Sequence, residues 1–344
     1  MNCIKKTSVI YTFLHFWVDF STIFLIANVL LGPKVAMVHR ANVIILYNLI
    51  AFAGQLPIGI MADMTGKNKL YVSFSCILAA IAYPAAFVAP WVACFLAALG
   101  NGAFHIGAGA DILHMSMPKS GLAGIFVSSG ALGVWLAYRC GGTGFALLCP
   151  LICVISAICL MFTKNTCTSP VDNTIHFSKP KSVITLAILC FMLTIVIRSL
   201  IGSVMKFSWQ QLPLLSFASV LALAGGKALG GILGDKFGCV KVALVSLGIS
   251  LVAFCFSHIH IIGLIAILCF NMTMPITLTA IADLCNKKYG FAFGLTTFAL
   301  AMGFLPVVFG IRDFSANMLC LTVAISIVLI LLGFYASHKG NRRE

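Results

Sequence analysis

The chain has 344 residues, of which 61% are hydrophobic and 9% are charged, and its mean hydropathy is +1.09. A soluble globular domain carries about 25% charged residues, so this composition excludes a soluble enzyme, a disordered chain and a nucleic-acid-binding domain. The net charge is +14, but the basic residues stand a few at a time between apolar runs. This spread is typical of membrane topology and not of a basic patch, so we expect the lipid bilayer as partner and no nucleic acid.

A membrane-spanning helix needs about 20 apolar residues, and the chain contains twelve runs of about that length. The predicted spans are 8–31, 41–62, 70–88, 91–113, 121–139, 143–162, 183–203, 212–234, 240–258, 260–282, 290–311 and 315–337. We expect the first run to be a span because it is too long for the apolar core of a signal peptide. The 14 cysteines include no CxxC pair, so they predict small buried side chains and neither disulfides nor a metal site.

One long polar segment, 163–182, lies near the middle of the chain. It predicts a cytoplasmic linker between two six-helix bundles, an N-terminal one at 1–162 and a C-terminal one at 183–344. One set of loops holds 15 Lys and Arg residues, and the other set holds 5. Because cytoplasmic loops are rich in these residues, we expect a multi-pass protein of the cytoplasmic membrane with both termini in the cytoplasm.

Two loops, one in each half of the chain, share the same spaced glycine, aspartate and lysine residues. The loop after the second span reads GIMADMTGKNK (59–69), and the loop after the eighth span reads GILGDKFGCVK (231–241). Gly, Asp, Gly and Lys recur at one offset of 172 residues, which is half the chain length. Repeats of six spans are an architecture of secondary transporters.

These two loops resemble the signature loop of the major facilitator superfamily. Within it, HFWVD (15–19) and GNGAFH (100–105) resemble the fosmidomycin-resistance-like branch, although Ile106 stands where that branch usually has proline. The resemblance implies an all-α fold of two rigid bundles that rock about a central site lined by spans 1, 4, 7 and 10. It also implies a transporter and not an enzyme.

The resemblance further implies a gate formed by the two loops. The predicted gate residues are Gly59, Asp63, Gly66, Lys67, Gly231, Asp235, Gly238 and Lys241. Each Asp can accept hydrogen bonds at the N-terminus of a neighbouring helix, and each Lys can pair with a cytoplasmic carboxylate. Such contacts would hold one conformation and break in the other. The alternative is a plain tight turn, in which Gly and Asp are common; the duplication favours the gate.

Four polar residues, Thr12, His15, Asp19 and Thr22, share one face of the first span. An ionisable side chain at membrane depth is costly and therefore indicates a functional site. Since histidine titrates near neutrality, we expect His15 and Asp19 to bind and release a proton during transport. The alternative is a structural hydrogen-bonded pair that holds this span against a neighbour.

Six further polar residues are predicted to line the substrate cavity: Gln55, Asn101, His105, Arg198, Asn271 and Thr277. His105 either contacts the substrate or the proton, or is a satisfied core histidine. Arg198 cannot be neutralised, so it either binds an anion or extends to the outer interface. Pro275, between Asn271 and Thr277, predicts an interruption of the tenth span.

We therefore expect a monomeric, proton-coupled secondary transporter for a small-molecule substrate, with protons and no other cofactor. Asp19 is the one carboxylate deep in a span, and this scarcity of acids favours a neutral or anionic metabolite; efflux of a toxic compound is equally compatible. The alternatives are a non-transporting membrane sensor of the same fold, a facilitated-diffusion uniporter, and a membrane-embedded enzyme. The enzyme would need a cluster of acids, histidines or metal ligands at an interface, and the sequence predicts none.

Overall fold

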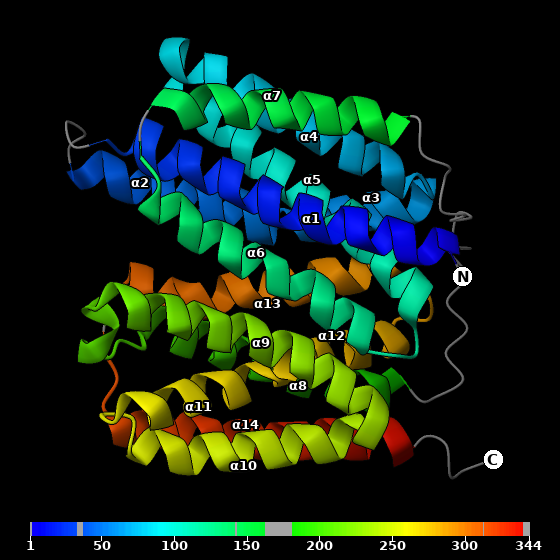
Figure 1. The fold of residues 1–344 in the computed structure, drawn as a ribbon. Helices are drawn as coiled ribbons and strands as arrows, with labels where there is room; N and C mark the ends of the chain where they lie inside the picture. Colours follow the sequence, from blue (N-terminus) through cyan, green and yellow to red (C-terminus); the bar gives the residue numbers. More distant parts are fainter. Residues whose placement is uncertain (1, 33–36, 142, 162–180, 312, 340–344) are drawn as a thin grey trace. The chain divides into compact units, whose positions relative to one another are not determined.

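The computed structural model describes residues 2–32, 37–141, 143–161, 181–311 and 313–339 (Figure 1). Every regular element in these residues is helical. Ten of the helices are long and apolar enough to cross a membrane, and two shorter apolar helices, Gly144–Leu160 and Cys239–Cys255, add to them. The prediction of an all-helical membrane fold is confirmed: ten of the twelve predicted spans are helices long enough to cross a membrane, and the sixth and ninth correspond to the two shorter apolar helices.

The chain divides into two compact units, which are described here one at a time. Unit 1 contains Met1–Met115, Ser129–Val171 and Lys288–Phe298. Its helices are α1 (Asn2–Phe24) with the π-helix η1 (Leu25–Leu30), α2 (Met37–Asn48) with the π-helix η2 (Leu49–Ala53), α3 (Gln55–Thr65), α4 (Asn68–Val88), α5 (Pro90–Ser116) and α7 (Thr143–Met161), together with parts of α6 (Gly121–Arg139) and α13 (Tyr289–Val308). Buried aromatic and small side chains form its core, among them Phe20, Phe24, Tyr47, Tyr83, Ala97 and Ala98.

Unit 2 contains Ser116–Ser128, Asp172–Lys287 and Ala299–Glu344. Its helices are α8 (Lys181–Val204), the short 3-10 helix η3 (Ser208–Gln211), α9 (Pro213–Phe237), α10 (Cys239–Cys255), α11 (His260–Asn271), α12 (Thr273–Leu284) and α14 (Ala316–Lys339), with the remaining parts of α6 and α13. Its core includes Ile201, Leu247, Phe254, Phe270, Val323 and Ile330. In this unit α14 packs against both α8 and α10.

The tenth predicted span is interrupted in the structure, as Pro275 predicts. The helix α11 ends at Asn271, and α12 begins at Thr273. Proline has no N–H group, so the carbonyl of Asn271 has no helical donor four residues later. The break thus lies where Pro275 removes a donor, whereas Pro84, Pro150 and Pro306 lie inside uninterrupted helices.

The predicted linker 163–182 lies outside the described residues except for Lys181 and Ser182, which begin α8. The boundaries at 162 and 183 therefore stay predictions. Two helices contribute to both units, because the first part of α6 groups with unit 2 and the first part of α13 groups with unit 1.

Candidate functional site

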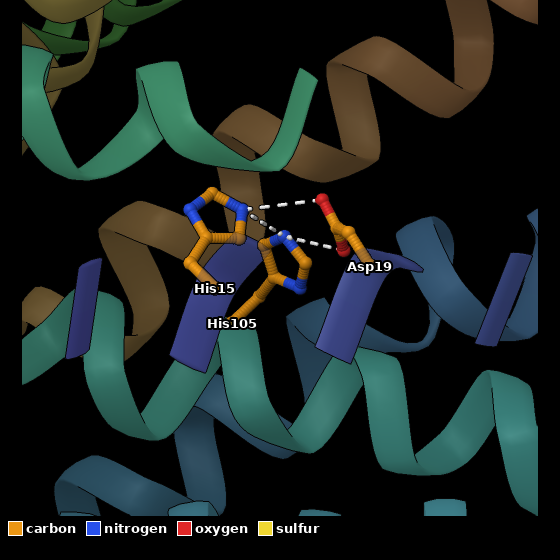
Figure 2. A group of neighbouring side chains, drawn as sticks. All are labelled: His15, Asp19 and His105. Atoms are coloured by element: carbon orange, nitrogen blue, oxygen red, sulfur yellow. Dashed lines mark hydrogen bonds and ion pairs between the residues drawn. The ribbon is translucent and has the colours of Figure 1, made fainter. Parts of the chain in front are cut away.

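Two histidines and one aspartate meet in the interior of unit 1 (Figure 2). His15 and Asp19 lie one turn apart on α1, and His105 lies on α5. The Nε2 atoms of the two histidines are 2.9 Å apart. His15 Nε2 is 3.4 Å from Asp19 Oδ2, and His105 Nε2 is 3.7 Å from Asp19 Oδ1. The structure thus joins the predicted proton-binding pair and one predicted cavity residue in a single cluster.

Asn101 of α5 contacts two of the three members of this cluster, Asp19 and His105. Its side-chain amide donates hydrogen bonds to Asp19 Oδ1 at 2.8 Å and to Thr22 Oγ1 at 3.2 Å. Its main-chain oxygen lies 2.8 Å from His105 Nδ1. Because a carbonyl only accepts hydrogen bonds, His105 Nδ1 carries a proton, and in the neutral ring Nε2 presents its lone pair. That lone pair lies on the side of His15 and Asp19.

The cluster is largely shielded from solvent. Asp19 is 9% exposed and His15 is 4% exposed, while His105 is half-buried. The ring of Phe104 lies 6.0 Å from the His15 ring, and the ring of Phe293 lies 6.4 Å from the His105 ring, measured between centroids. Ligand atoms of His15, Asp19 and His105 all lie within 4.8 Å of one another, so these side chains have the spacing to hold a metal ion.

Gln55 lies fully buried at the start of α3, also in unit 1. Its Nε2 donates to the carbonyl of Ala51 at 2.5 Å, whereas its Oε1 accepts no hydrogen bond. A Cβ added to Gly102 of α5 would lie 3.4 Å from Gln55 Cγ, so α5 passes close to this side chain. A buried acceptor without a donor is costly, which makes Gln55 a candidate for binding a donor group of a solute.

Two of the predicted cavity residues meet in unit 2. Arg198 of α8 is 7% exposed, and its Nη1 donates to Thr277 Oγ1 of α12 at 3.2 Å. The described residues place no carboxylate within ion-pair distance of Arg198. Asn271 instead donates to the main-chain oxygen of Ile267 in its own helix at 2.9 Å. The structure therefore joins Arg198 with Thr277 but does not bring Asn271 to them.

The first gate aspartate binds the start of a helix that is remote in sequence. Asp63 Oδ1 accepts the N–H of Gly290 at 2.8 Å, and Oδ2 accepts the N–H of Phe291 at 2.7 Å. These N–H groups belong to the first turn of α13, where no helical acceptor exists. A carboxylate is stabilised at this position by the positive end of the helix dipole.

The second gate aspartate makes the equivalent contact in unit 2. Asp235 Oδ1 accepts the main-chain N–H of Ser120 at 2.6 Å and the Ser120 hydroxyl at 3.0 Å, and Oδ2 accepts the N–H of Gly121 at 2.9 Å. Ser120 and Gly121 begin α6. The sequence repeat is therefore also a repeat of contacts.

Glycines allow the helices to touch backbone to backbone beside each aspartate. A Cβ on Gly59 would meet the main-chain oxygen of Gly290, and a Cβ on Gly231 would meet the main-chain oxygen of Ser120. No other residue type fits without a shift of the neighbouring helix. Gly59 and Gly231 are matched positions of the repeat.

The other predicted gate residues are two glycines that end helices and two exposed lysines. Gly66 ends α3 with a φ of 62°, and Gly238 ends α9 with a φ of 93°; both values favour glycine. Lys67 and Lys241 are exposed, and the described residues give neither of them an ion pair. The predicted pairing of these lysines with a carboxylate is therefore not present in the described part of the chain.

The partners of the two aspartates were missed at the sequence level. Ser120 and Gly290 carry no motif of their own, and a main-chain N–H leaves no signature in a sequence. The available signal is the similarity of GLAG (121–124) to GFAFG (290–294), each of which follows an aspartate at a span end.

No protein-family model and no curated protein matches the sequence, whereas solved structures do. The fucose:proton symporter FucP of E. coli is 14% identical, with a TM-score of 0.67 over 98% of this chain and 99% of that chain. A bacterial homologue of the iron transporter ferroportin is 12% identical, with a TM-score of 0.65 over 99% of this chain and 100% of that chain. The human organic anion transporter MFSD10 is 16% identical, with a TM-score of 0.62 over 96% of this chain and 98% of that chain. FucP is a major facilitator superfamily transporter, and this chain shares that transporter fold along nearly its whole length.

Proposed function

We propose that this chain is a secondary transporter that moves a small solute across a membrane by alternating access. The observation that carries the proposal is the duplicated contact of Asp63 with the start of α13 and of Asp235 with the start of α6. Hydrogen bonds to a helix N-terminus can form in one conformation and break in another, and both contacts would then bias a two-state equilibrium.

A plain tight turn does not account for these contacts. An aspartate that only stabilises its own turn bonds to nearby main-chain groups, whereas Gly290 lies 227 positions after Asp63 and Ser120 lies 115 positions before Asp235. The remote partners therefore favour the gate over the turn.

Proton coupling at His15 and Asp19 is part of this proposal. Histidine exchanges protons near neutral pH. The cluster contains a second histidine, His105, whose Nε2 lies 2.9 Å from His15 Nε2 and could share the proton. FucP, with the same fold, is a fucose:proton symporter. The alternative is a structural pair, in which case Asp19→Asn would change stability but leave the dependence of transport on a pH gradient intact.

The setting of the transporter is also proposed. The Lys and Arg distribution supports a cytoplasmic membrane with both termini in the cytoplasm, and a monomer suffices for the mechanism. The motifs at 15–19 and 100–105 support the fosmidomycin-resistance-like branch. Efflux of a toxic compound is one expectation for the cargo. A neutral or anionic metabolite is the other expectation. Arg198 is buried, and no carboxylate among the described residues pairs with it, which supports an anionic group; MFSD10 is an organic anion transporter.

The test begins with thermal unfolding of the purified chain against a panel of metabolites, antimicrobials and metal salts. A ligand at about 100 times its Kd stabilises the folded state by about 2.7 kcal/mol. A ligand that stabilises the protein is then used for counterflow in proteoliposomes. Counterflow measures the exchange of labelled solute outside for unlabelled solute inside, and it needs no ion gradient. Exchange that slows in Asp63→Asn supports the transporter, whereas binding without exchange supports the membrane sensor. Exchange of the ligand that is not accompanied by its accumulation when a pH gradient is imposed supports the uniporter.

A further inference from the structure

We infer that His15, Asp19 and His105 bind a divalent transition-metal ion such as Zn²⁺ or Co²⁺, and that this ion is the substrate. The metal site is inferred from the geometry of unit 1 alone. The role of the ion as substrate rests on the proposed transport function.

The donor atoms and their spacing fit such an ion. Imidazole nitrogen and carboxylate oxygen are ligands of Zn²⁺ and of its neighbours in the first transition row. With metal–nitrogen bonds of about 2.0–2.1 Å, two ligand atoms lie about 2.9 Å apart at an octahedral ion and about 3.3 Å apart at a tetrahedral ion. The two Nε2 atoms are 2.9 Å apart, and each approaches a different oxygen of Asp19: His15 lies 3.4 Å from Oδ2, and His105 lies 3.7 Å from Oδ1. One ligand atom from each residue lies within 4.8 Å of the others, so a turn of the carboxylate brings one of its oxygens and both nitrogens to one ion.

Asn101 provides the outer contacts that a metal site requires. A histidine ligand almost always donates its second ring N–H to a carboxylate, a main-chain carbonyl or water. His105 Nδ1 lies 2.8 Å from the main-chain oxygen of Asn101, so Nε2 is the ring nitrogen that can bind an ion, and it faces His15 and Asp19. The same residue fixes the carboxylate of Asp19 through its side-chain amide. One turn of α5 thus orients two of the three ligands.

A glycine of α6 packs directly against the ligands. A Cβ on Gly130 would meet Asp19 Oδ2 and would lie 2.5 Å from His15 Nε2. Any side chain at this position would therefore push both ligand atoms away from the arrangement that binds the ion.

The number of ligands favours a carried ion over a structural one. Structural zinc sites use four protein ligands, whereas sites with three keep a position open to water or another ligand. Among the described residues, this cluster supplies three such groups. An open position lets ligands exchange, which an ion that must be released requires.

A cationic substrate departs from the neutral or anionic class that the scarcity of acids predicts. One carboxylate suffices here because two histidines from separate spans complete the ligand set. Residue counts cannot detect this convergence, since His105 lies 90 positions after His15.

The first experiment titrates Co²⁺ into the purified full-length chain, carrying an affinity tag without histidine, and records the electronic absorption spectrum. We expect one ion per chain with ligand-field bands of nitrogen and oxygen ligands and no thiolate charge-transfer band. Asp19→Asn and His105→Gln should abolish saturable binding, and Asn101→Ala should weaken it by about 10- to 100-fold. His258→Gln, an exposed histidine in unit 2, is the matched control and should bind as the wild type does.

Thermal unfolding keeps the result interpretable if a variant folds poorly. Gly130→Ala provides a further test that keeps all three ligand residues and should weaken Co²⁺ binding at least tenfold. Absence of saturable binding by the wild type would overturn the metal site. A thiolate band, or equal binding by wild type and a folded Asp19→Asn, would overturn it too, because the ion would then lie at cysteines or elsewhere.

The second experiment measures Co²⁺ entry into proteoliposomes that contain a metal-sensitive dye. Entry that is lost in His105→Gln and altered in Asp63→Asn supports the ion as substrate. Binding without entry overturns that role. If Co²⁺ does not bind at all while another solute shows counterflow, the metal inference fails and the transporter proposal stands.

Discussion

Asp63 and Asp235, which are 172 positions apart in the sequence, make the same contact in the two units. Each carboxylate accepts main-chain N–H groups at the start of a helix, α13 for Asp63 and α6 for Asp235. In both cases the helix belongs to the opposite half of the sequence. A duplicated sequence motif is thereby matched by a duplicated set of hydrogen bonds.

Replacing either aspartate by asparagine should shift the conformational equilibrium with little effect on folding. Asparagine offers one acceptor oxygen in place of two and no negative charge at the helix N-terminus, a loss of about 1 kcal/mol. That is about fivefold in the ratio of two conformations for Asp63→Asn and again for Asp235→Asn. Counterflow rates and thermal unfolding of each variant measure the two effects. Unchanged counterflow in both variants would contradict the gate.

A methyl group between the crossing helices should have a similar effect through sterics. Gly59→Ala and Gly231→Ala each place a Cβ against a main-chain oxygen, so we expect slower counterflow in both. A Cβ on Gly225, which lies in the same helix α9 as Gly231, would meet no atom within 4 Å. Gly225→Ala is therefore the control: its free energy of unfolding should stay unchanged or rise by up to about 1 kcal/mol, because alanine favours helix. Equal effects of Gly225→Ala and Gly231→Ala would show that helix propensity, and not contact, is responsible.

Arg198 should contribute to function more than to stability. A buried guanidinium with one neutral hydrogen-bond partner, Thr277, pays a desolvation cost that this bond does not offset. We therefore expect Arg198→Met to unfold at the same temperature as the wild type or higher, with impaired transport. Thr277→Val removes the partner hydroxyl and should have a smaller effect on transport. A large loss of stability in Arg198→Met, together with normal transport, would make this arginine structural.

Asp111 should be structural. It is 1% exposed in α5 and accepts hydrogen bonds from Tyr11 at 3.0 Å and from Asn68 at 2.8 Å. Asp111→Ala leaves both donors buried without this acceptor, so the free energy of unfolding should fall by about 1–3 kcal/mol. Tyr11→Phe removes one bond alone and should cost about 1 kcal/mol. Chemical denaturation in detergent measures both, and Co²⁺ binding should remain in the folded fraction; loss of binding in folded Asp111→Ala would assign it to the site.

The boundaries of the spans could be predicted closely, because the length of each apolar run and the glycine, proline and charged residues beside it determine where the helix begins and ends. The fifth span is predicted at 121–139, and α6 is Gly121–Arg139. The break before α12 lies where Pro275 removes a hydrogen-bond donor. The π-helical segments η1 and η2 could not be predicted, because a shift in main-chain hydrogen bonding leaves the apolar pattern unchanged.

The site could be predicted only where one helix carries it. His15 and Asp19 are four positions apart, so helical periodicity places them together. Their meeting with His105 depends on how α1 and α5 are rotated against each other, which the periodicity of either helix alone does not specify. Asn271 shows the opposite case, since its polar side chain is satisfied within its own helix.

The most direct test of the account measures distances between the two units in the reconstituted chain. Spin labels placed at Val88 in unit 1 and His258 in unit 2, both exposed, require a chemistry other than thiol labelling because the chain has 14 cysteines. Pulsed electron spin resonance should give two distance populations in the wild type. Asp63→Asn combined with Asp235→Asn should change their ratio by about 25- to 30-fold, as expected for the loss of two contacts of about 1 kcal/mol each. A single population that the double variant leaves unchanged would contradict alternating access.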